Sequence, residues 1–566
     1  MSDTPFRVLS ADRSEHPNFF TQDPVLQSLL ARLLPEETRA WVWPKLRRMG
    51  AEVPAVVEER AALCDKQTPV LKNFDRYGHR VDEVVYPQAY REMEAVSYGS
   101  GMLTVKYDRE VRQVHRGAEQ VAGMALSFLF AQAECGQSCP VCMTDGIARV
   151  LELFGSKEQQ ERHVPRLSAR DPDQLARGAM FLTEKQGGSD VGANATRAVP
   201  QEDGSWKLYG EKWFCSNVDG ELALVLARPD GAPAGTKGLG LFLMAHRRAD
   251  GTLNGQRIDR LKDKLGVRSM PTGEVVLDGA DAELVGDLHR GFKQMAEMLN
   301  TSRLWNALCS ASGMRRVVHE ATEYLRSRRA FGKTALELPL VRETLADLNA
   351  EEIGAKALVF KLVQLVSEGD RGDPTAKKMV RVVTPLAKYY TAKVAVWAAS
   401  EGVELLGGNG YIEDSPMPRL LRDMQVLPVW EGTTNILILD ALRAIVKTGA
   451  HLTLFEEVRE RLERSPQRLA QEARQIAEIV QLAQKDLEVI AAEGQDRAAG
   501  ILRTFTDRLY FAYDFALLLE SAAEDSQAGR SIAAALRRLI RRHHAPQART
   551  SAEDMVALVD ATVTPA

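Results

Sequence analysis

The sequence predicts a mainly α-helical protein with one β domain near its middle. Apolar residues repeat at three- and four-residue spacing on both sides of the middle, while short β-prone runs separated by glycine turns occupy the middle itself. The 566 residues are also too many for one core. We expect a helical domain at 1–177, a β-barrel or sandwich at 178–288, a four-helix bundle at 289–450 and a helical extension at 451–566.

The N-terminal domain shows helical periodicity from Pro24 onward. Residues 121–133 and 146–154 have apolar side chains at helical spacing and no alternating stretch. The segment 75–87 interrupts this pattern and predicts a turn followed by extended chain.

The β domain begins near Gly178. We expect strands at 180–183, 205–216, 222–227, 240–245 and 274–277, separated by turns such as 229–231 and 250–251. About a hundred residues of this kind are typical of a small barrel or sandwich.

Helical periodicity returns after Gly291 and continues through the extension. The bundle contains the stripe Ala392, Val396, Ala399, Val403 and Leu406. The extension contains two stripes: Leu469, Ala473, Ile476, Val480, Ala483, Leu487 and Ile490, and then Leu502, Phe505, Leu509, Ala512 and Leu519.

Composition limits the classes of function. Hydrophobic residues make up 45% and charged residues 27%, as in a soluble globular protein, and the net charge of −4 gives no overall attraction to nucleic acid or membrane. No apolar run approaches the ~20 residues that span a bilayer. The first twelve residues have no apolar signal core, so we expect a cytoplasmic protein.

Three of the six cysteines lie close together. Cys135, Cys139 and Cys142 have a spacing that some iron–sulfur proteins use. Pro140 lies between two of the thiols, and small buried thiols on a helix explain the run equally well. We favour buried thiols and expect no metal site.

The stretch 430–437 places Glu431 beside Trp430 and before Gly432 and two threonines. An apolar neighbour makes a carboxylate a stronger base, and small residues leave room for a flat cofactor. A catalytic glutamate and a solvated glutamate in a turn between helices both remain open from this stretch alone.

Four further motifs precede Glu431 in a fixed order. They are TEKQGGSD at 183–190, GEKWFCSN at 210–217, RRAFG at 328–332 and LGGNGY at 406–411. Together with Glu431, these motifs resemble the flavin-dependent acyl-CoA dehydrogenase family over residues 120–450. The resemblance implies a helix–β–helix order of domains, an FAD cofactor and an acyl-CoA substrate.

The resemblance also assigns roles to residues. Glu431 would be the base that takes the α proton of the thioester while the flavin takes a hydride from the β carbon. The Glu431 backbone N–H and a flavin hydroxyl would hold the carbonyl. Ser189 would lie near the pantetheine arm and Arg303 would hold the CoA, although Asn300 replaces the family's usual Asp.

The remaining implied residues contact the flavin. Thr183 would touch the isoalloxazine edge, Phe214 would stack on the ring, and Ser216 would lie near N5. Arg328 would reach the pyrophosphate. The other implied cofactor residues are Phe331, Leu406, Gly407, Gly408, Thr433 and Asn435.

Several departures from the family pattern, among them Lys185, Asn435, the segment 75–87 and the long extension, resemble the AidB-like branch. We therefore keep two functions open. One is an acyl-CoA dehydrogenase that passes electrons to electron-transfer flavoprotein or a similar acceptor and assembles as a homo-tetramer or dimer. The other is an FAD protein that binds and protects DNA. DNA binding needs a basic surface, which would be supplied by the cluster Arg537, Arg538, Arg541, Arg542, His543 and His544. We do not favour it, because charge runs are usually solvated surface.

Overall fold

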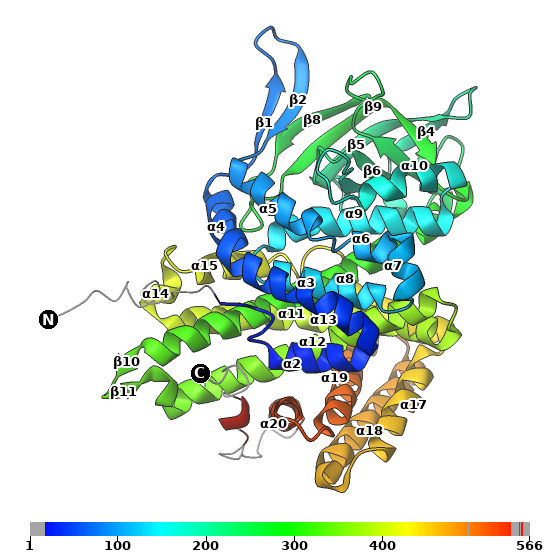
Figure 1. The fold of residues 1–566 in the computed structure, drawn as a ribbon. Coiled ribbons are helices and arrows are strands. Elements are labelled where there is room, and N and C mark those ends of the chain that lie inside the picture. The colour runs from blue at the N-terminus through cyan, green and yellow to red at the C-terminus, as the bar shows by residue number, and fades with distance from the viewer. Residues whose placement is uncertain (1–16, 496, 545–553, 555, 559–566) are drawn as a thin grey trace, which may run out of the picture. The chain divides into compact units, whose positions relative to one another are not determined.

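The computed structural model describes residues 17–495, 497–544, 554 and 556–558 (Figure 1). Its internal contacts divide the chain into two compact units. We call Val56–Phe130 with Glu134–Trp305 the β unit, and Met1–Ala55 with Ala131–Ala133 and Asn306–Ala566 the helical unit. Each unit has its own elements and is described by itself.

The β unit begins with helices and a β-hairpin. The elements are α4 (Glu58–Lys66), β1 (Val70–Phe74), β2 (Arg80–Val85), α5 (Gln88–Gly99), α6 (Thr104–Tyr107), α7 (Arg109–Val114), α8 (Glu119–Ala131), α9 (Cys135–Phe154) and α10 (Lys157–Leu167). A short π-helix (Val53–Val57) precedes them. α10 begins with a capping box, in which Ser156 and Gln159 each bond the other's backbone N–H.

The β1–β2 hairpin lies at the predicted turn and extended segment. Val70 pairs with Val85 and Lys72 with Glu83, and the chain turns between them at 75–79. Two polar side chains fasten the hairpin to Ile258 of the main sheet: the Asn73 amide donates to its carbonyl at 2.8 Å, and Asp82 accepts from its N–H at 2.9 Å.

The rest of the β unit is a seven-stranded, barrel-like sheet. Its strands are β3 (Gly178–Phe181), β4 (Arg197–Pro200), β5 (Trp206–Ser216), β6 (Leu222–Pro229), β7 (Gly240–Ala245), β8 (Gln256–Leu261) and β9 (Thr272–Leu284). The strand order is β3-β5-β4-β6-β7-β9-β8, and the additional β3–β6 and β5–β9 pairings curl the sheet on itself. The expected strands lie in β3, β5, β6, β7 and β9, whereas β4 and β8 were not expected.

Strand β6 shows why this region folds as a covered sheet. Its side chains Ala223, Val225 and Ala227 belong to the core inside the barrel. The alternate side chains Leu222, Leu224 and Leu226 belong to a second core that includes side chains of α9. A strand buried on both faces needs an unbroken apolar run, which this sequence has.

The helical unit contains the predicted bundle and extension. Its elements are α2 (Pro24–Leu33), α3 (Glu36–Glu52), the second half of α11 (Gly291–Ser327), β10 (Arg329–Ala330), β11 (Lys333–Thr334), α12 (Pro339–Asp370), α13 (Pro374–Leu406), α14 (Gly408–Tyr411), α15 (Met417–Met424), α16 (Thr434–Thr448), α17 (Ala450–Glu463), α18 (Ala470–Glu493), α19 (Ala499–Ala522) and α20 (Gln527–His543). Short 3-10 turns join some of the elements of both units.

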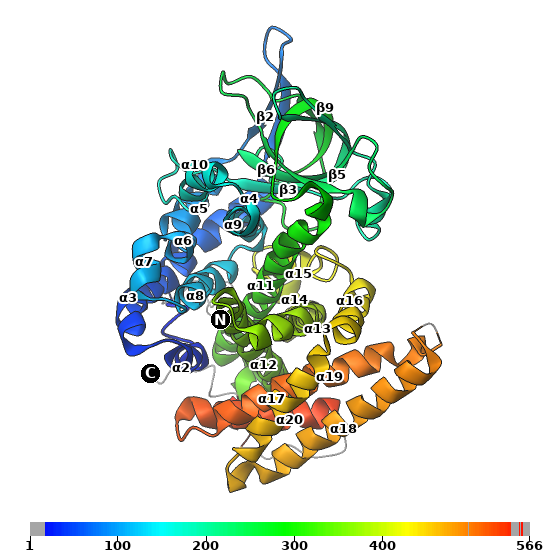
Figure 2. The same cartoon turned by 90° about the vertical axis from the view of Figure 1, so that its right-hand side faces the viewer.

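The extension packs on the bundle. α18 packs along α19, and both α19 and α20 contact α12 (Figure 2). Among the described residues, no helix combines the length and the apolar character that crossing a membrane requires.

A buried ionic network ties α2 to the bundle. Asp23 caps α2 through the Leu26 N–H and also accepts from the Lys356 ammonium at 2.6 Å. Arg315 and Glu352 complete the network. Burial alone would raise the pKa of Asp23, but the charges of Lys356 and Arg315 lower it.

Candidate functional site

Glu431 lies in the turn between α15 and α16 of the helical unit. The turn follows the end of α15, where the Trp430 N–H bonds to the Val426 carbonyl at 3.1 Å. Glu431 has φ 58° and Gly432 has φ 102°, so two successive residues adopt positive φ. This region is costly for a residue with a side chain and persists only where the surroundings hold it. The glutamate is therefore in a defined, strained turn rather than on a regular helix surface.

A buried contact from α13 holds the turn. The Lys388 ammonium, on α13, donates to the Gly432 carbonyl at 2.6 Å, and Lys388 is 0% exposed. Asn435, at the start of α16, accepts from Arg503 of the extension at 3.1 Å on the surface. Lys388 was not among the residues predicted from sequence. The sequence could have indicated that Lys388 is buried, because it lies four residues before Ala392 and so extends the apolar stripe with a charged side chain.

Phe214 and Ser216 lie at the end of β5 in the β unit. The pairing between β5 and β9 shifts register between Lys212 and Cys215, which is a β-bulge. Phe214, which lies in this bulge, is 56% exposed. The Lys262 ammonium lies 3.3 Å from the Trp213 ring centroid and 5.0 Å from that of Phe214. Phe214 is therefore an exposed aromatic residue beside the Lys262 cation.

Thr183 lies beside this bulge, because its carbonyl accepts from the Trp213 N–H at 2.9 Å. A Cβ added at Gly188 would come within 2.7 Å of the Thr183 hydroxyl, so the loop after Thr183 needs glycine there. Ser189 lies farther along the same loop and is exposed.

Glu184 anchors that loop and is buried. Its carboxylate accepts from the Lys212 ammonium at 2.8 Å, from the Thr196 hydroxyl at 2.5 Å, and from the backbone N–H groups of Ala195 and Thr196. Burial alone would raise its pKa, but the Lys212 charge and these hydrogen bonds lower the pKa of Glu184 to about 2. Glu184 is thus ionised at neutral pH and has a structural role. Its ion pair with Lys212 joins the motif at 183–190 to the motif at 210–217.

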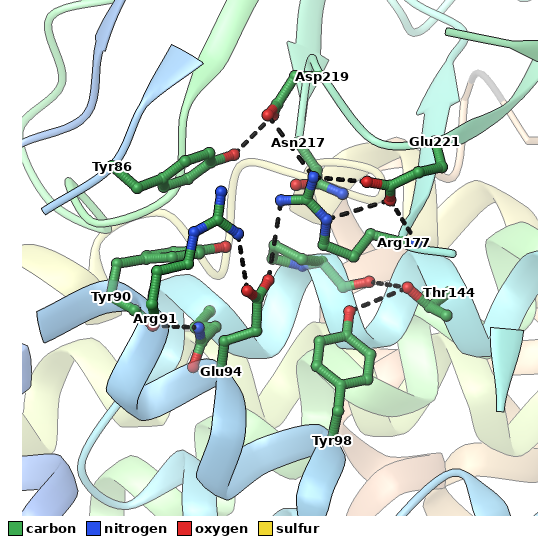
Figure 3. Close-up of polar contacts among 12 residues, drawn as sticks. Tyr86, Tyr90, Arg91, Glu94, Tyr98, Thr144, Arg177, Asn217, Asp219 and Glu221 are labelled. Atoms are coloured by element: carbon green, nitrogen blue, oxygen red, sulfur yellow. Dashed lines mark hydrogen bonds and ion pairs between the residues drawn. The ribbon is translucent and has the colours of Figure 1, made fainter. Parts of the chain in front are cut away.

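The turn after β5 is held by a polar cluster, shown in Figure 3. Arg177 pairs with Glu221 at 2.7 Å and lies 3.7 Å from Asp219 and from Glu94, while the Tyr86 hydroxyl donates to Asp219 at 2.6 Å. Burial alone would lower the pKa of Arg177, but Asp219 and Glu221 raise it well above its usual value. Arg177 therefore keeps its positive charge among these carboxylates.

Asn217 is the last residue of the motif at 210–217 and begins this turn. It is fully buried with φ 52°, and its amide donates to the Gly178 carbonyl at 2.9 Å. Asparagine tolerates positive φ better than most residues, which explains its place at the end of the motif.

Arg328 and the glycine motif lie together in the helical unit. Arg328 donates to the Tyr324 hydroxyl at 2.7 Å, and the Asn409 amide bonds to the same hydroxyl at 2.9 Å. A Cβ added at Gly407 would lie 3.7 Å from the Arg328 guanidinium. Next to them, the β10–β11 hairpin presents Phe331, which is 91% exposed.

The candidate residues therefore divide between the two units. Thr183, Ser189, Phe214, Ser216 and Arg303 belong to the β unit, with Arg303 on α11. Arg328, Phe331, Leu406, Gly407, Gly408, Glu431, Thr433 and Asn435 belong to the helical unit.

The three clustered cysteines lie along α9. Cys135 and Cys142 are buried, and Cys139 is partly buried. Within the part of the chain that the structure describes, no group of three or more His, Cys, Asp or Glu side chains is arranged to hold a metal ion.

The basic cluster predicted on a helix lies in and just after α20. Arg538 is 3% exposed and pairs with Asp347 and Glu343 of α12, and Arg537 pairs with Glu472 and Asp554. Further pairs join Arg541 to Glu343, Arg542 to Asp347 and Glu351, His543 to Glu351, and His544 to Glu478. The expectation of solvated basic surface is wrong for Arg538, because the extension packs it against the bundle.

Comparisons with known proteins agree on one family. Residues 179–280 match the acyl-CoA dehydrogenase middle domain and 289–446 its C-terminal domain, while 10–174 match the N-terminal domain of the adaptive response protein AidB. The chain is 36% identical to acyl-CoA dehydrogenase family member 11 of Caenorhabditis elegans, covering 91% of this chain and 86% of that protein. It is 33% identical to the putative acyl-CoA dehydrogenase AidB of Escherichia coli, covering 81% and 85%.

A solved structure supports the same assignment. The Caenorhabditis elegans protein ACDH-11, solved in complex with C11-CoA, is 31% identical with a TM-score of 0.87, and the match covers 100% of this chain and 93% of that one. Sequence and fold agree over nearly the whole length of both proteins. The chain belongs to the acyl-CoA dehydrogenase family.

Proposed function

We propose that this protein is an FAD-dependent acyl-CoA dehydrogenase in which Glu431 is the catalytic base. The observation that supports this most is the turn that carries Glu431, with its two successive positive φ values and its buried tie to α13. Strained turns of this kind cluster at functional sites. Family membership gives FAD as the cofactor and supports α,β-desaturation of a thioester as the proposed reaction.

The residues present fit a flat cofactor that carries phosphates. The β unit offers the exposed Phe214 ring as a stacking platform, with Thr183 and Ser216 as polar neighbours. The helical unit offers the exposed Arg328 guanidinium, whose fork of donors suits a pyrophosphate, next to the open backbone at Gly407. Gly408, Phe331, Leu406, Thr433 and Asn435 complete the proposed cofactor contacts.

The proposed reaction divides between cofactor and protein. FAD, when bound, supplies the acceptor for the hydride from the β carbon. The Glu431 carboxylate removes the proton from the α carbon, so the two C–H bonds break and the double bond forms between them. The Glu431 backbone N–H donates to the thioester carbonyl, which stabilises the charge that develops there when the proton leaves.

An acyl-CoA substrate is supported by the ACDH-11 structure, which was solved with C11-CoA. Arg303 on α11 is the proposed cation for the CoA, with Ser189 near the pantetheine arm. Asn300 supplies no charge beside Arg303, so CoA binding rests more on Arg303 than in relatives with an Asp. Electron-transfer flavoprotein or a similar acceptor, and assembly as a homo-oligomer, remain part of this proposal.

DNA protection is not part of the proposal. Phosphate binding needs cations that are free to replace counterions. The arginines of α20 that would supply them pair instead with carboxylates of α12 and of the extension.

The proposal is tested with the Glu431→Gln variant. Purified wild-type protein should be yellow and should bleach when mixed anaerobically with C11-CoA or another chain in a short-to-long panel. Glu431→Gln should keep its FAD but be reduced at least about 100-fold more slowly, since it lacks the general base. Glu413→Gln, which alters an exposed glutamate paired with Arg422, is the control and should react like wild type.

Two results would count against the proposal. Wild-type protein that holds FAD but is not bleached by any member of the panel would refute the activity. Reduction of Glu431→Gln at the wild-type rate would refute the role of Glu431.

A further inference from the structure

Lys388 is a fully buried lysine whose ammonium ends at the catalytic turn. It lies on α13, is 0% exposed, and donates to the Gly432 carbonyl at 2.6 Å. Burying an ammonium group is costly unless strong hydrogen bonds compensate. A methionine or leucine would fill the same space on this apolar stripe without that cost, so the charge calls for a role beyond packing.

The accepting carbonyl belongs to the residue after Glu431. Gly432 has φ 102° and Glu431 has φ 58°, so the backbone on both sides of the carboxylate is in a conformation that nearby contacts must maintain. A hydrogen bond from a charged donor is about twice as strong as a neutral one. The bond from Lys388 therefore fixes the peptide plane that follows Gly432 and limits how far the turn can relax toward ordinary φ values.

The two residues that follow Lys388 fasten this section of α13 to the extension. The next residue, Tyr389, donates its hydroxyl to Asp507 of α19 at 2.6 Å. Tyr390 stacks on Tyr510 with ring centroids 4.0 Å apart, and its hydroxyl lies 3.1 Å from the His543 Nε2 of α20. The ammonium is thus presented from a rigid section of α13, as a positioning contact requires.

We propose that Lys388 is a positioning residue, which holds the turn of Glu431 in its strained conformation through the Gly432 carbonyl. The expected effect of Lys388 on the reaction rests on the proposed function, whereas its effect on the conformation of the turn does not. Lys388 touches neither the thioester nor the flavin in this proposal. It acts through its hydrogen bond to the backbone of the turn.

The test compares Lys388→Met with Lys356→Met. Lys356 is also 0% exposed and lies on the neighbouring helix α12, but its ammonium pairs with Asp23 and Glu352. Both variants lose a buried ammonium, and only one loses the contact with the turn. Any effect of destabilisation alone should therefore appear in both.

The first measurement is amide hydrogen exchange in peptides that cover 428–436, which needs no substrate. Lys388→Met should raise exchange there by about tenfold or more, the change expected when one hydrogen bond from a charged donor is lost. Lys356→Met should leave these peptides at the wild-type rate. If Lys388→Met does not fold, Lys388→Gln replaces it with the same expectation, because the charged donor is again lost.

The second measurement is flavin reduction by C11-CoA in single turnovers. Lys388→Met should lower the reduction rate constant by about tenfold or more, while FAD content and the half-saturating concentration of C11-CoA stay within about twofold of wild type. Lys356→Met should keep the wild-type rate constant per bound FAD.

The outcomes separate this inference from the proposed function. Unchanged exchange at 428–436 in Lys388→Met, or equal acceleration in Lys356→Met, overturns the positioning role. A wild-type protein that no acyl-CoA reduces overturns the proposed function, while the exchange result still decides whether Lys388 holds the turn.

Discussion

The ion pair between Glu184 and Lys212 gives a quantitative prediction about the loop at 183–190. The Lys212 side chain is 0% exposed and that of Glu184 is 5% exposed, with 2.8 Å between nitrogen and oxygen. Lys212→Met would leave a buried carboxylate with hydrogen bonds but without its counter-charge. Breaking a buried pair in this way typically costs about 3–5 kcal/mol.

The pKa of Glu184 leads to a similar magnitude. A fall from the usual 4.5 to about 2 corresponds to about 3 kcal/mol of preference for the ionised form in the folded state. Burial lowers the pKa of Lys212, so the pair as a whole stabilises less than this. Most of the loss in Lys212→Met therefore comes from the carboxylate that remains. Because the pKa of Glu184 is lower in the folded state, its stabilising effect is complete above about pH 4.5 and disappears as the pH falls toward 2.

Denaturant unfolding at pH 7.5, followed by circular dichroism, measures this cost. Lys212→Met should lose about 3–5 kcal/mol, whereas Lys207→Met should lose less than about 1 kcal/mol. Lys207 lies on the same strand and pairs with Asp281 at 2.6 Å, but both side chains are about one-third or more exposed. Adding Glu184→Gln to Lys212→Met should recover much of the loss, since no charge is then stranded. Equal losses in the two lysine variants would refute the reasoning.

Two further predictions concern single buried cations and bases. Burial, with a smaller contribution from the Arg162 charge, lowers the pKa of His163 from 6.5 to about 4, so the free energy of unfolding should fall as the pH drops from about 6.5 to 4. His163→Gln should make this pH dependence weaker in denaturant titrations at several pH values, and an unchanged pH dependence would contradict the assignment. Arg538→Met should lower the unfolding free energy by about 1–2 kcal/mol because it removes the pairs with Glu343 and Asp347, and a neutral result would mean that these contacts to α12 do not stabilise the extension.

Five of the seven strands of the main sheet were expected from the sequence, and the two exceptions have a common cause. Strand β6 has an unbroken apolar run, and the segment 75–87 has clear turn residues. β4 has the sequence Arg-Ala-Val-Pro, with only two apolar residues before the proline, and β8 alternates Ile258 with charged side chains such as Arg257 and Asp259. Their pairing comes from longer neighbouring strands, which a local pattern does not contain.

The candidate site shows a similar division. Glu431 and Phe214 stand in ordered motifs, so the sequence alone singles them out, and their proposed roles stay predictions. The positive φ values of the turn at 431–432 and the tie from Lys388 depend on contacts between residues 44 positions apart. A lysine in a helix usually lies on the surface, so a buried one is not expected unless its place on the apolar stripe is noticed.

The arginines of α20 illustrate the same limit for charge. Within the sequence they form a dense basic run, which is the pattern of a phosphate-binding surface. Their partners Glu343, Asp347 and Glu351 lie about 190 residues earlier on α12. Local net charge therefore overestimates the free positive charge of this helix.

These contacts make the extension part of the bundle's interior rather than an appended domain. Glu351 is 4% exposed and bonds to His543 at 2.7 Å, and Asp514 is fully buried, with burial raising its pKa well above the usual value. Cutting the chain at 450 would remove Asp514 and His543 and would uncover Glu351 together with the surfaces of α12 and α13 on which the extension packs. It would also remove the partners of Tyr389 and Tyr390, the two residues that follow Lys388. A change in the extension is therefore expected to alter the conformation of the Glu431 turn through α13. For this reason, a chain cut at 450 would not behave like a family member without the extension.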